Sequence, residues 1–583
     1  MLVAGLLAPL GAWAAPAPDA RLGQGFQIII WQDQSPARLA GLRALGVTGL
    51  RVLASRDHPD PATIAAAVAP ARAAAMPFYL ENLATDFFAA YHRYRPGLPE
   101  NAAFRAVQAR HAEAPTDGTV FVREPSLADP AWRARIAERL AVHVRAIGTP
   151  RPLFISLADE PGIADLAAPW DFDRGAYSRA WIVAWLRQRY GTLGALNAAW
   201  GSHLASWEAA MPPDTTAAMA DPALIPAWMD GKAAMDAQFA DALGAATAAL
   251  HVADPGALSA IEGAQPPGWG GWDYARLVRS VDAMEIYDLG PSLDVARGLA
   301  PDLPILTTSA ADAAQAWPGI LHGTRGLILW DDAGALVNDG GTPGPRGRAL
   351  APMLRTLRGP VGAALAASRP SFDAVGILYA PASFRLAWLL RHRAAGDAWT
   401  RLDSVQSIGP DPWRDAMGAA AESLARAGYV PRFVDAESVS AAALQGLRVL
   451  ILPQSIALSD ETLGVLRAFV AGGGRLLADT PPGLYDELGH ARQARLRVTL
   501  SEPAAMPAVL GFASRVTAKG AVLRLLDTPQ GLLLGVLPDA AGAVTLHFAR
   551  PYRVTDLRTG RVSQGDALTV PAQADAPGLL LLH

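Results

Sequence analysis

Eight short apolar runs of strand type alternate with helix-like stretches between residues 26 and about 350, and this alternation limits the fold more than any other feature. The runs are Gln27–Trp31, Leu50–Ala54, Pro77–Glu81, Leu153–Leu157, Ala257–Glu262, Ala283–Tyr287, Pro304–Thr308 and Gly326–Trp330. Amphipathic stretches such as Pro36–Leu45, Pro61–Ala74 and Pro130–Ile147 separate them. This pattern predicts an α/β fold, a (β/α)8 barrel over residues 22–365. No glycine-rich phosphate loop follows the first run, which weighs against nucleotide binding.

Two further patterns follow the barrel. Strand-like Val375–Tyr379, Leu447–Leu452 and Arg475–Asp479 alternate with helical Pro412–Ala427 and Asp460–Ala471, which predicts a small parallel α/β domain over residues 370–497. Gly472, Gly473 and Gly474 follow a helix and precede a strand, so they indicate a helix end and turn rather than a phosphate loop. Short alternating segments in residues 498–583 predict a small antiparallel β-sandwich. These are Ala521–Leu526, Gly531–Val536, Ala543–His547, Leu568–Val570 and Gly578–Leu582.

Composition excludes several classes of protein. The 583 residues are 51% hydrophobic and 18% charged, which suits large buried sheets and argues against disorder. Net charge is −4 with no basic run, so no nucleic-acid partner is expected. The chain has no cysteine, which excludes disulfides, thiol nucleophiles and cysteine-ligated zinc.

The first 17 residues, MLVAGLLAPLGAWAAPA, have the pattern of a secretory signal peptide. An apolar core precedes Ala12-Trp13-Ala14, which fits an A-x-A cleavage site, although a basic n-region is missing. No other apolar run is long and uninterrupted enough to cross a bilayer. The mature protein is therefore expected to be soluble, without membrane attachment, and periplasmic or secreted.

Acidic residues stand at or just after the ends of several predicted strands, and aromatic residues accompany them. The acids are Glu81, Asp159, Glu160, Glu262, Glu285, Asp288, Asp331 and Asp332, and the aromatics are Trp31, Trp269, Trp272, Tyr287, Trp317 and Trp330. In a barrel these strand ends converge on one face. Carboxylates accept hydrogen bonds from sugar hydroxyls and aromatic faces pack on sugar rings, so the set indicates a carbohydrate partner, with no cofactor required.

Other chemistries lack their sequence patterns. The 11 histidines show no HExxH or similar spacing, so no metal site is expected. His58, His92 and His322 are interpreted as hydrogen-bonded or solvated residues. No GxSxG elbow is present, which argues against a serine esterase.

The stretch AWLRQRYGTLGALNAAWGSHLASW (184–207) resembles the segment after the acid-bearing fourth strand in family 42 glycoside hydrolases, the β-galactosidases and their relatives. Trp185, Tyr190, Gly191, Leu193, Leu196, Asn197, Trp200, Gly201 and Trp207 carry the match, and GTRGLILW (323–330) is similar to the family's eighth strand. The resemblance implies a barrel, a flavodoxin-like trimerisation domain and a small β-domain in this order. It also implies self-association as a trimer.

The family carries its acid/base glutamate after the fourth strand, usually in an Asn-Glu pair. Here the pair is Asp159-Glu160, so the resemblance gives Glu160 the acid/base role. An ionised Asp159 would favour the protonated form of its neighbour, as suits a general acid, and would also bind a sugar hydroxyl.

The family's second glutamate, at the end of the seventh strand, has no counterpart in PILTTSAADA (304–313). Glu262 is the favoured substitute, because it lies at a strand end beside Gly263. Glu285, inside the sixth run, is the next choice and otherwise a substrate-binding residue; Asp312, Asp331, Glu81 or no nucleophile remain open. The distance between the carboxyl groups of Glu160 and its partner decides whether the anomeric configuration is retained, at about 5–5.5 Å, or inverted, at about 6.5–9.5 Å.

The sequence thus predicts an exported glycoside hydrolase that cleaves a β-glycosidic bond, with Glu160 and Glu262 as its catalytic pair. Trp269, Trp272, Tyr287 and Trp330 are the expected sugar platforms. Two alternatives are a catalytically inert barrel that binds polysaccharide or organises an export or surface complex, and an exopolysaccharide lyase or transglycosylase.

Overall fold

The fold is described from a computed structural model of the 583-residue chain. The structure describes residues 20–23, 25–53, 60–81, 83–84, 113–114, 121–123, 125–163, 169–309, 312–331, 335–396, 409–493 and 496–583. The predicted signal peptide, His58, His92 and Asp332 lie outside these residues. In the described part, no helix is long and apolar enough to cross a membrane.

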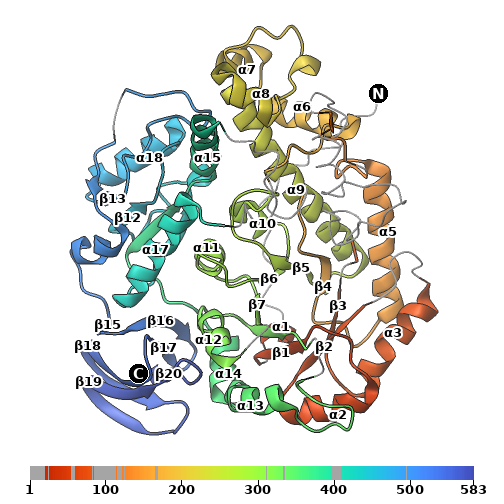
Figure 1. Ribbon diagram of the computed structural model, residues 1–583, viewed down its shortest axis with the longest axis vertical. Coiled ribbons are helices and arrows are strands. Elements are labelled where there is room, and N and C mark those ends of the chain that lie inside the picture. The colour runs from red at the N-terminus through yellow and green to blue at the C-terminus, as the bar shows by residue number, and fades with distance from the viewer. Residues whose placement is uncertain are drawn as a thin grey trace.

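Eight parallel strands close into a barrel in sequence order, as the alternation predicted. They are β1 (Gln27–Ile30), β2 (Gly49–Val52), β3 (Phe78–Leu80), β4 (Ile155–Asp159), β5 (Ser259–Ala264), β6 (Ala283–Ile286), β7 (Ile305–Ser309) and β8 (Gly326–Leu329). The main helices around it are α2 (Pro36–Leu45), α3 (Pro61–Ala73), α5 (Pro130–Ile147), α9 (Ile225–Ala253), α11 (Ser292–Leu299), α12 (Ala313–Leu321), α13 (Pro345–Arg358) and α14 (Pro360–Ala366), with short α1 (Ala20–Gly23) and α10 (Tyr274–Leu277) (Figure 1).

Local signals explain the helix boundaries. Helix α2 starts with proline at its first position and ends at Gly46, whose φ of 114° only glycine adopts readily. Helix α5 is capped by Asp129, whose side chain accepts a hydrogen bond from the Ala131 N–H. These local signals are why α2 and α5 have the bounds that the sequence predicts.

Side chains along the strands alternate between the barrel interior and the layer under the helices. Ile29, Tyr79, Ala260, Leu306 and Ile328 belong to one buried cluster inside the barrel, whereas Ile28 and Ile30 belong to the larger core outside it. Because successive side chains point to opposite faces, residues two positions further along each strand also face inward. This second interior layer is the floor of the barrel mouth.

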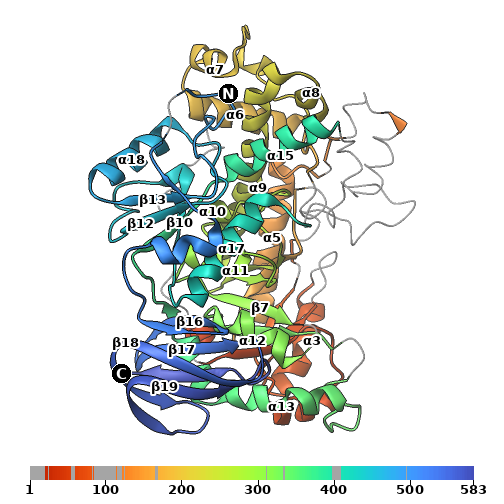
Figure 2. The same cartoon turned by 60° about the vertical axis from the view of Figure 1, so that its left-hand side comes forward.

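A helical insertion between β4 and β5 comprises α6 (Ala176–Tyr190), α7 (Leu193–Trp200) and α8 (Thr215–Ala220), and the chain continues into the 29-residue helix α9, which lies below them in Figure 2. The family-like motif lies in α6, α7 and the turn that follows. The Tyr190 hydroxyl and the Trp200 indole donate to one oxygen of buried Asp230 on α9, at 2.5 and 2.7 Å. The Asn197 amide binds the turn at Leu204. The motif therefore attaches α6 and α7 to the barrel.

The second domain holds a five-stranded parallel sheet in the order β11-β10-β12-β13-β14. Its strands are β10 (Val375–Tyr379), β11 (Arg432–Asp435), β12 (Val449–Leu452), β13 (Arg475–Ala478) and β14 (Thr499–Leu500). Its helices are α15 (Pro381–Ala395), α17 (Pro412–Arg426) and α18 (Asp460–Ala471). The Gly473 N–H caps α18 by donating to the Val470 carbonyl, so the three glycines form a helix end, as predicted.

The C-terminal part is a seven-stranded sheet in which β15 (Val516–Ala518), β16 (Ala521–Thr528), β17 (Gly531–Pro538), β18 (Gly542–Asp556), β19 (Val562–Ala572) and β20 (Gly578–Leu582) pair antiparallel. The seventh strand, β9 (Arg369–Pro370), comes from the segment that leaves the barrel and pairs with β16. Ion pairs join the parts: Arg385 to Asp236 at 2.6 Å and Arg524 to Asp294 at 2.9 Å.

Candidate active site

The floor of the barrel mouth is built from the second interior layer. It holds Trp31, Arg51, Glu81, Glu262, Glu285, Thr308 and Trp330, each two positions beyond an inward-facing strand residue or its neighbour. Asp159 and Glu160 at the end of β4 and Tyr287 after β6 are half-buried next to it. Arg51 and Thr308 were not among the predicted site residues, although the two-residue period of β2 and β7 places both in this layer.

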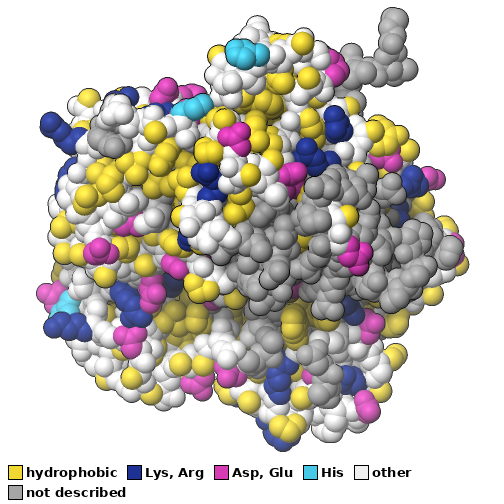
Figure 3. All heavy atoms as spheres, turned by 45° about the horizontal axis from the view of Figure 1, so that its top comes forward, with side chains coloured by type: hydrophobic (Ala, Val, Ile, Leu, Met, Phe, Trp, Pro, Cys, Tyr) yellow, Lys and Arg dark blue, Asp and Glu magenta, His cyan; other side chains and the backbone are white. Residues whose placement is uncertain are grey.

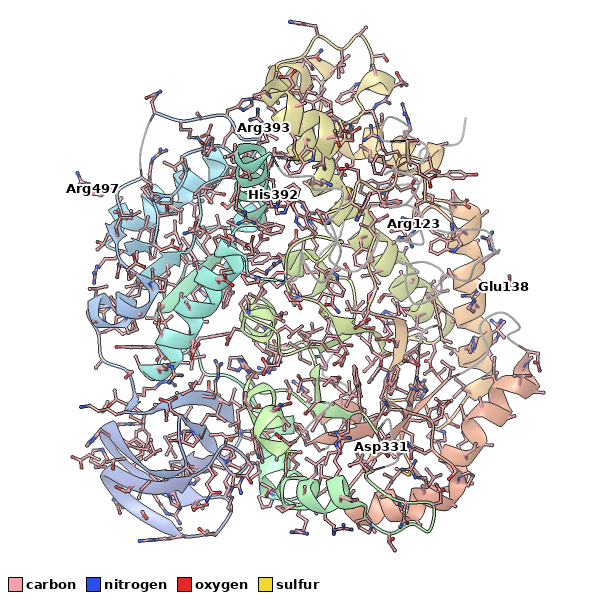
Figure 4. All side chains as sticks on the ribbon, in the orientation of Figure 1. Arg123, Glu138, Asp331, His392, Arg393 and Arg497 are labelled. Atoms are coloured by element: carbon pink, nitrogen blue, oxygen red, sulfur yellow. The ribbon has the colours of Figure 1, made fainter. Side chains whose placement is uncertain are left out.

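Glu160 has the backbone conformation least expected of a glutamate. Its φ is +44°, in the left-handed region that side-chain-bearing residues seldom occupy. Its N–H donates to the Glu262 carbonyl at 3.0 Å, and its Oε1 accepts a hydrogen bond from the Tyr287 hydroxyl at 3.0 Å. Buried Arg123 donates to the carbonyls of Gly162 and Ile163, which fixes the segment that follows (Figure 4). The carboxyl is thus held in a defined place at the mouth.

Gly263 separates Glu160 from Glu285. Its φ is +61°, and an added Cβ would lie 2.5 Å from the Glu160 Cγ. Its N–H donates to Oε2 of Glu285, while the Thr308 hydroxyl donates to Oε1. Gly263 therefore binds the Glu285 carboxyl through its N–H and leaves no room for a side chain next to the Glu160 methylene group.

Glu285 is 3% exposed, and burial is the main cause that raises its pKa from 4.5 to about 7. The hydrogen bonds from Thr308 and Gly263 act in the opposite direction, and the nearby charge of Glu160 adds to the rise. A carboxyl with this pKa exchanges its proton near neutral pH, which suits a group that takes part in acid–base or nucleophilic chemistry.

The carboxyl of Glu262 binds a residue of the layer below the mouth. Its Oε2 accepts a hydrogen bond from the Tyr79 hydroxyl at 2.6 Å, and Tyr79 belongs to the fully buried layer below. The side chain is 2% exposed, and burial first, then the charges of Glu81 and Asp159, raise its pKa well above the usual range. The position predicted for the nucleophile is therefore occupied by a buried carboxyl whose neutral form is favoured.

Asp159 requires a correction. The predicted carboxylate was ionised, but burial, followed by the charges of Glu81, Glu160 and Glu285, raises the pKa of Asp159 well above the usual range. A neutral Asp159 has an O–H group to donate. It therefore resembles the amide of the family's Asn-Glu pair more closely than an anion would.

Glu81 pairs with Arg51, the cation at the floor of the barrel mouth. Its two oxygens accept hydrogen bonds from the Trp31 indole and from Arg51, each at 2.7 Å. The Arg51 guanidinium also lies over the Trp31 ring, 4.4 Å from its centroid. Both partners are engaged, so this pair holds the floor together and Glu81 is not a free nucleophile.

The predicted sugar platforms divide into two groups. Trp330 is half-buried at the mouth, 5.9 Å from the Trp31 ring, and Tyr287 is half-buried beside Glu160. Trp272 is fully buried against Phe239 of α9, so the prediction that it stacks on a sugar is wrong. Trp269 is 5% exposed and packs against Phe384 of the second domain, and its contact with a sugar stays a prediction.

Asp331 and Asp312 have structural roles. Asp331, labelled in Figure 4, is buried and pairs with Arg38 at 2.8 Å. Asp312 caps α12 through the Gln315 N–H. His322 contacts the Pro318 carbonyl and Asp294, as expected for a hydrogen-bonded residue. In the described part of the chain, no group of three or more His, Asp or Glu side chains is arranged to hold a metal ion. On the face in Figure 3, basic and acidic side chains are interspersed.

A closed (β/α)8 barrel with a carboxyl-rich mouth, followed by an α/β domain and a β-domain, defines the class: the fold is that of glycoside hydrolases. Family 42 enzymes are among the solved structures that share this fold. The chain matches the β-galactosidase from Bacillus circulans sp. alkalophilus with a TM-score of 0.71 and 12% identity, over 97% of this chain and 100% of that one. It matches Gan42B, a GH42 β-galactosidase from G. stearothermophilus, at 0.70 and 13%, over 96% and 98%.

A GH42 exo-carrageenase from Bacteroides ovatus matches with a TM-score of 0.60 and 11% identity, over 96% of this chain and 82% of that one. No protein-family model and no curated protein matches the chain. The resemblance read from the sequence is thus confirmed for the fold.

Proposed function

We propose that this protein is a glycoside hydrolase that cleaves a β-glycosidic bond, with Glu160 as general acid and base and Glu285 as its partner carboxylate. The observation that carries the proposal is that Gly263 binds the Glu285 carboxyl through its N–H and lies against the Glu160 side chain, at the mouth of a barrel with the fold of family 42 enzymes. Glu160 protonates the glycosidic oxygen, and ionised Glu285 attacks the anomeric carbon. Water then releases the sugar, with Glu160 as the base.

The choice of Glu285 over Glu262 follows from their partners. The carboxyl of Glu262 binds Tyr79 in the layer below, whereas that of Glu285 binds Thr308 of β7 and Gly263 beside Glu160. Thr308 belongs to the strand whose end carries the second glutamate in the family that the sequence resembles. Glu285 of β6 thus places a carboxyl next to β7, whose own sequence contains no acidic residue.

Substrate contact is assigned to the half-buried groups of the mouth. Trp330 and Tyr287 present aromatic surface, and neutral Asp159 presents a hydrogen-bond donor to a sugar hydroxyl or to Glu160 itself. Asp159→Asn is therefore expected to retain most of the activity at neutral pH, because an amide also donates. A loss of more than about tenfold would show that ionised Asp159 is required.

The test is hydrolysis of a panel of aryl glycosides, beginning with aryl β-galactosides, by the wild type and three isosteric variants. Glu160→Gln and Glu285→Gln are expected to reduce kcat by at least about 10³-fold, and Glu262→Gln by less than about tenfold. Glu160→Gly is expected to keep activity on substrates with strongly acidic phenol leaving groups, which need no proton. Azide is expected to restore turnover to Glu285→Gly by replacing its carboxylate.

The outcomes separate the alternatives. If the wild type cleaves no glycoside but binds polysaccharide, the protein is a catalytically inert, polysaccharide-binding barrel and not a hydrolase. If Glu262→Gln is inactive while Glu285→Gln is active, the nucleophile is Glu262, as the sequence alone suggested. Unsaturated sugar products would identify a lyase, and transfer products a transglycosylase.

Export and self-association complete the proposal. Residues 1–17 are expected to direct the protein across the inner membrane, which fractionation and N-terminal sequencing of the mature protein test. A homotrimer, implied by resemblance, is tested by light scattering. A full-length cytoplasmic protein or a monomer would refute these two expectations separately.

A further inference from the structure

A small cavity lies where the barrel, the second domain and the C-terminal sheet meet. Its volume is about 40 Å³, and α11, the end of α12, the segment after β9 and strand β16 line it. Figures 1 and 2 both place β16 beside α12. Because α11 and α12 lead into the starts of β7 and β8, the cavity belongs to the opposite end of the barrel from the mouth.

Arg297 of α11 is the unusual residue of this cavity. It is 3% exposed, and only its Nη1 has a partner, the Leu303 carbonyl at 2.9 Å. Its Nε and Nη2 are buried and find no acceptor among the described residues. The position of a Cβ on Gly323 would lie 3.3 Å from this Nη2. A buried guanidinium with two unpaired N–H-bearing atoms is costly, since both hydrogen bonds and a counter-charge are missing.

The acidic residues nearby are already engaged. Asp294 accepts a hydrogen bond from Arg524 at 2.9 Å and lies 3.4 Å from the His322 Nε2. Exposed Asp302 pairs with Arg369 at 2.7 Å. Burial lowers the pKa of the Arg297 guanidinium to about 9, and the nearby charge of buried Arg325 adds to this decrease. The region therefore carries more buried positive than negative charge.

The cavity has room for a compensating anion. One water molecule needs about 10–15 Å³ by the same measure, so about 40 Å³ holds roughly three waters or one small tetrahedral anion. An oxyanion accepts several hydrogen bonds at once, and a guanidinium fork matches two of its oxygens.

We propose that Arg297 forms a binding site for a small oxyanion, of which inorganic phosphate and sulfate are the free representatives. The bound anion joins α11 of the barrel to β16 of the C-terminal sheet, next to the Asp294–Arg524 ion pair. The site is independent of sugar cleavage, because it lies at the other end of the barrel.

The experiment measures thermal unfolding of the full chain in a zwitterionic buffer, with phosphate, sulfate or potassium chloride at matched ionic strength. A saturable rise in Tm of about 3 °C is expected with phosphate and with sulfate, and a smaller, non-saturating change with chloride. Titration calorimetry with phosphate is expected to give one site per chain.

Arg297→Met removes the charge and keeps the volume, and it is expected to abolish the saturable rise. It is also expected to fold, because replacing an unpaired buried charge by an apolar group relieves the burial cost. Arg187→Met is the matched control, since Arg187 is half-exposed in a surface pair with Glu208, and it should respond like the wild type. A wild-type response equal to that with chloride, or a saturable response that persists in Arg297→Met, would overturn the proposal.

Discussion

Replacing Glu285 by glutamine should make the protein more stable at alkaline pH and leave its stability nearly unchanged in acid. The folded state holds the Glu285 proton more tightly than the unfolded chain, because burial raises the pKa from 4.5 to about 7. Below pH 4.5 Glu285 is protonated in both the folded and the unfolded state, so its ionisation does not change the free energy of unfolding. Between pH 4.5 and 7 the unfolded chain loses its proton first, so the stability of the wild type falls as pH rises.

The magnitude follows from the shift. A difference of about 2.5 pKa units corresponds to about 3 kcal/mol, the full cost being reached above pH 7. Glutamine does not ionise and therefore avoids this cost. Its amide oxygen accepts the Gly263 N–H, and its NH2 group donates to the Thr308 hydroxyl, which rotates to accept. The isosteric variant thus keeps both contacts.

The assay is the Tm of the wild type and of Glu285→Gln between pH 4 and 8.5 at constant ionic strength. The difference in Tm is expected to be near zero at pH 4 and to reach about 2–3 °C at pH 8. The control variant is Glu138→Gln, which changes an exposed carboxyl on α5, outside the barrel interior (Figure 4). A difference for Glu285→Gln that does not change with pH would refute the reasoning, because no buried ionisation would then be present.

Three further predictions concern the neighbours. Tyr287→Phe removes the hydroxyl that holds Glu160 and should lower kcat/KM about 10- to 100-fold with little change in Tm; unchanged kinetics would contradict this role. Gly263→Ala places a Cβ against Glu160 in a strained backbone and should lower kcat about 100-fold and stability by about 1–2 kcal/mol; wild-type activity would contradict the contact. Asp230→Asn weakens the partner of Tyr190 and should lower stability by about 2–3 kcal/mol without changing KM, as urea unfolding and kinetics would show; an unchanged unfolding midpoint would contradict it.

The order of elements was predictable because its signals are local. Helices α2, α5 and α18 have the bounds read from proline, aspartate, serine and glycine at their ends. Barrel strands lie within two residues of their predicted positions. Strand β9 was not predicted, because its partner β16 lies more than 150 residues away and two residues carry no periodicity.

The sequence predicts which residues form the site better than it predicts how their side chains are oriented. The sequence places Glu262 near a strand end and Glu285 inside a strand, but the direction of each carboxyl depends on Tyr79 and Thr308 in other strands. Trp272 likewise is buried by a residue of α9, which no local pattern connects to it. Long-range packing therefore decided what the local pattern left open.

The left-handed backbone at Glu160 has a consequence for anyone who engineers this protein. Glycine and asparagine occupy a φ near +44° at lower energy than glutamate does, by about 1 kcal/mol or more. A screen that selects variants only for heat tolerance would therefore enrich glycine and asparagine at this position, and both substitutions remove the acid. Heat tolerance and turnover would have to be selected together, because at residue 160 the most stable sequence and the working sequence differ.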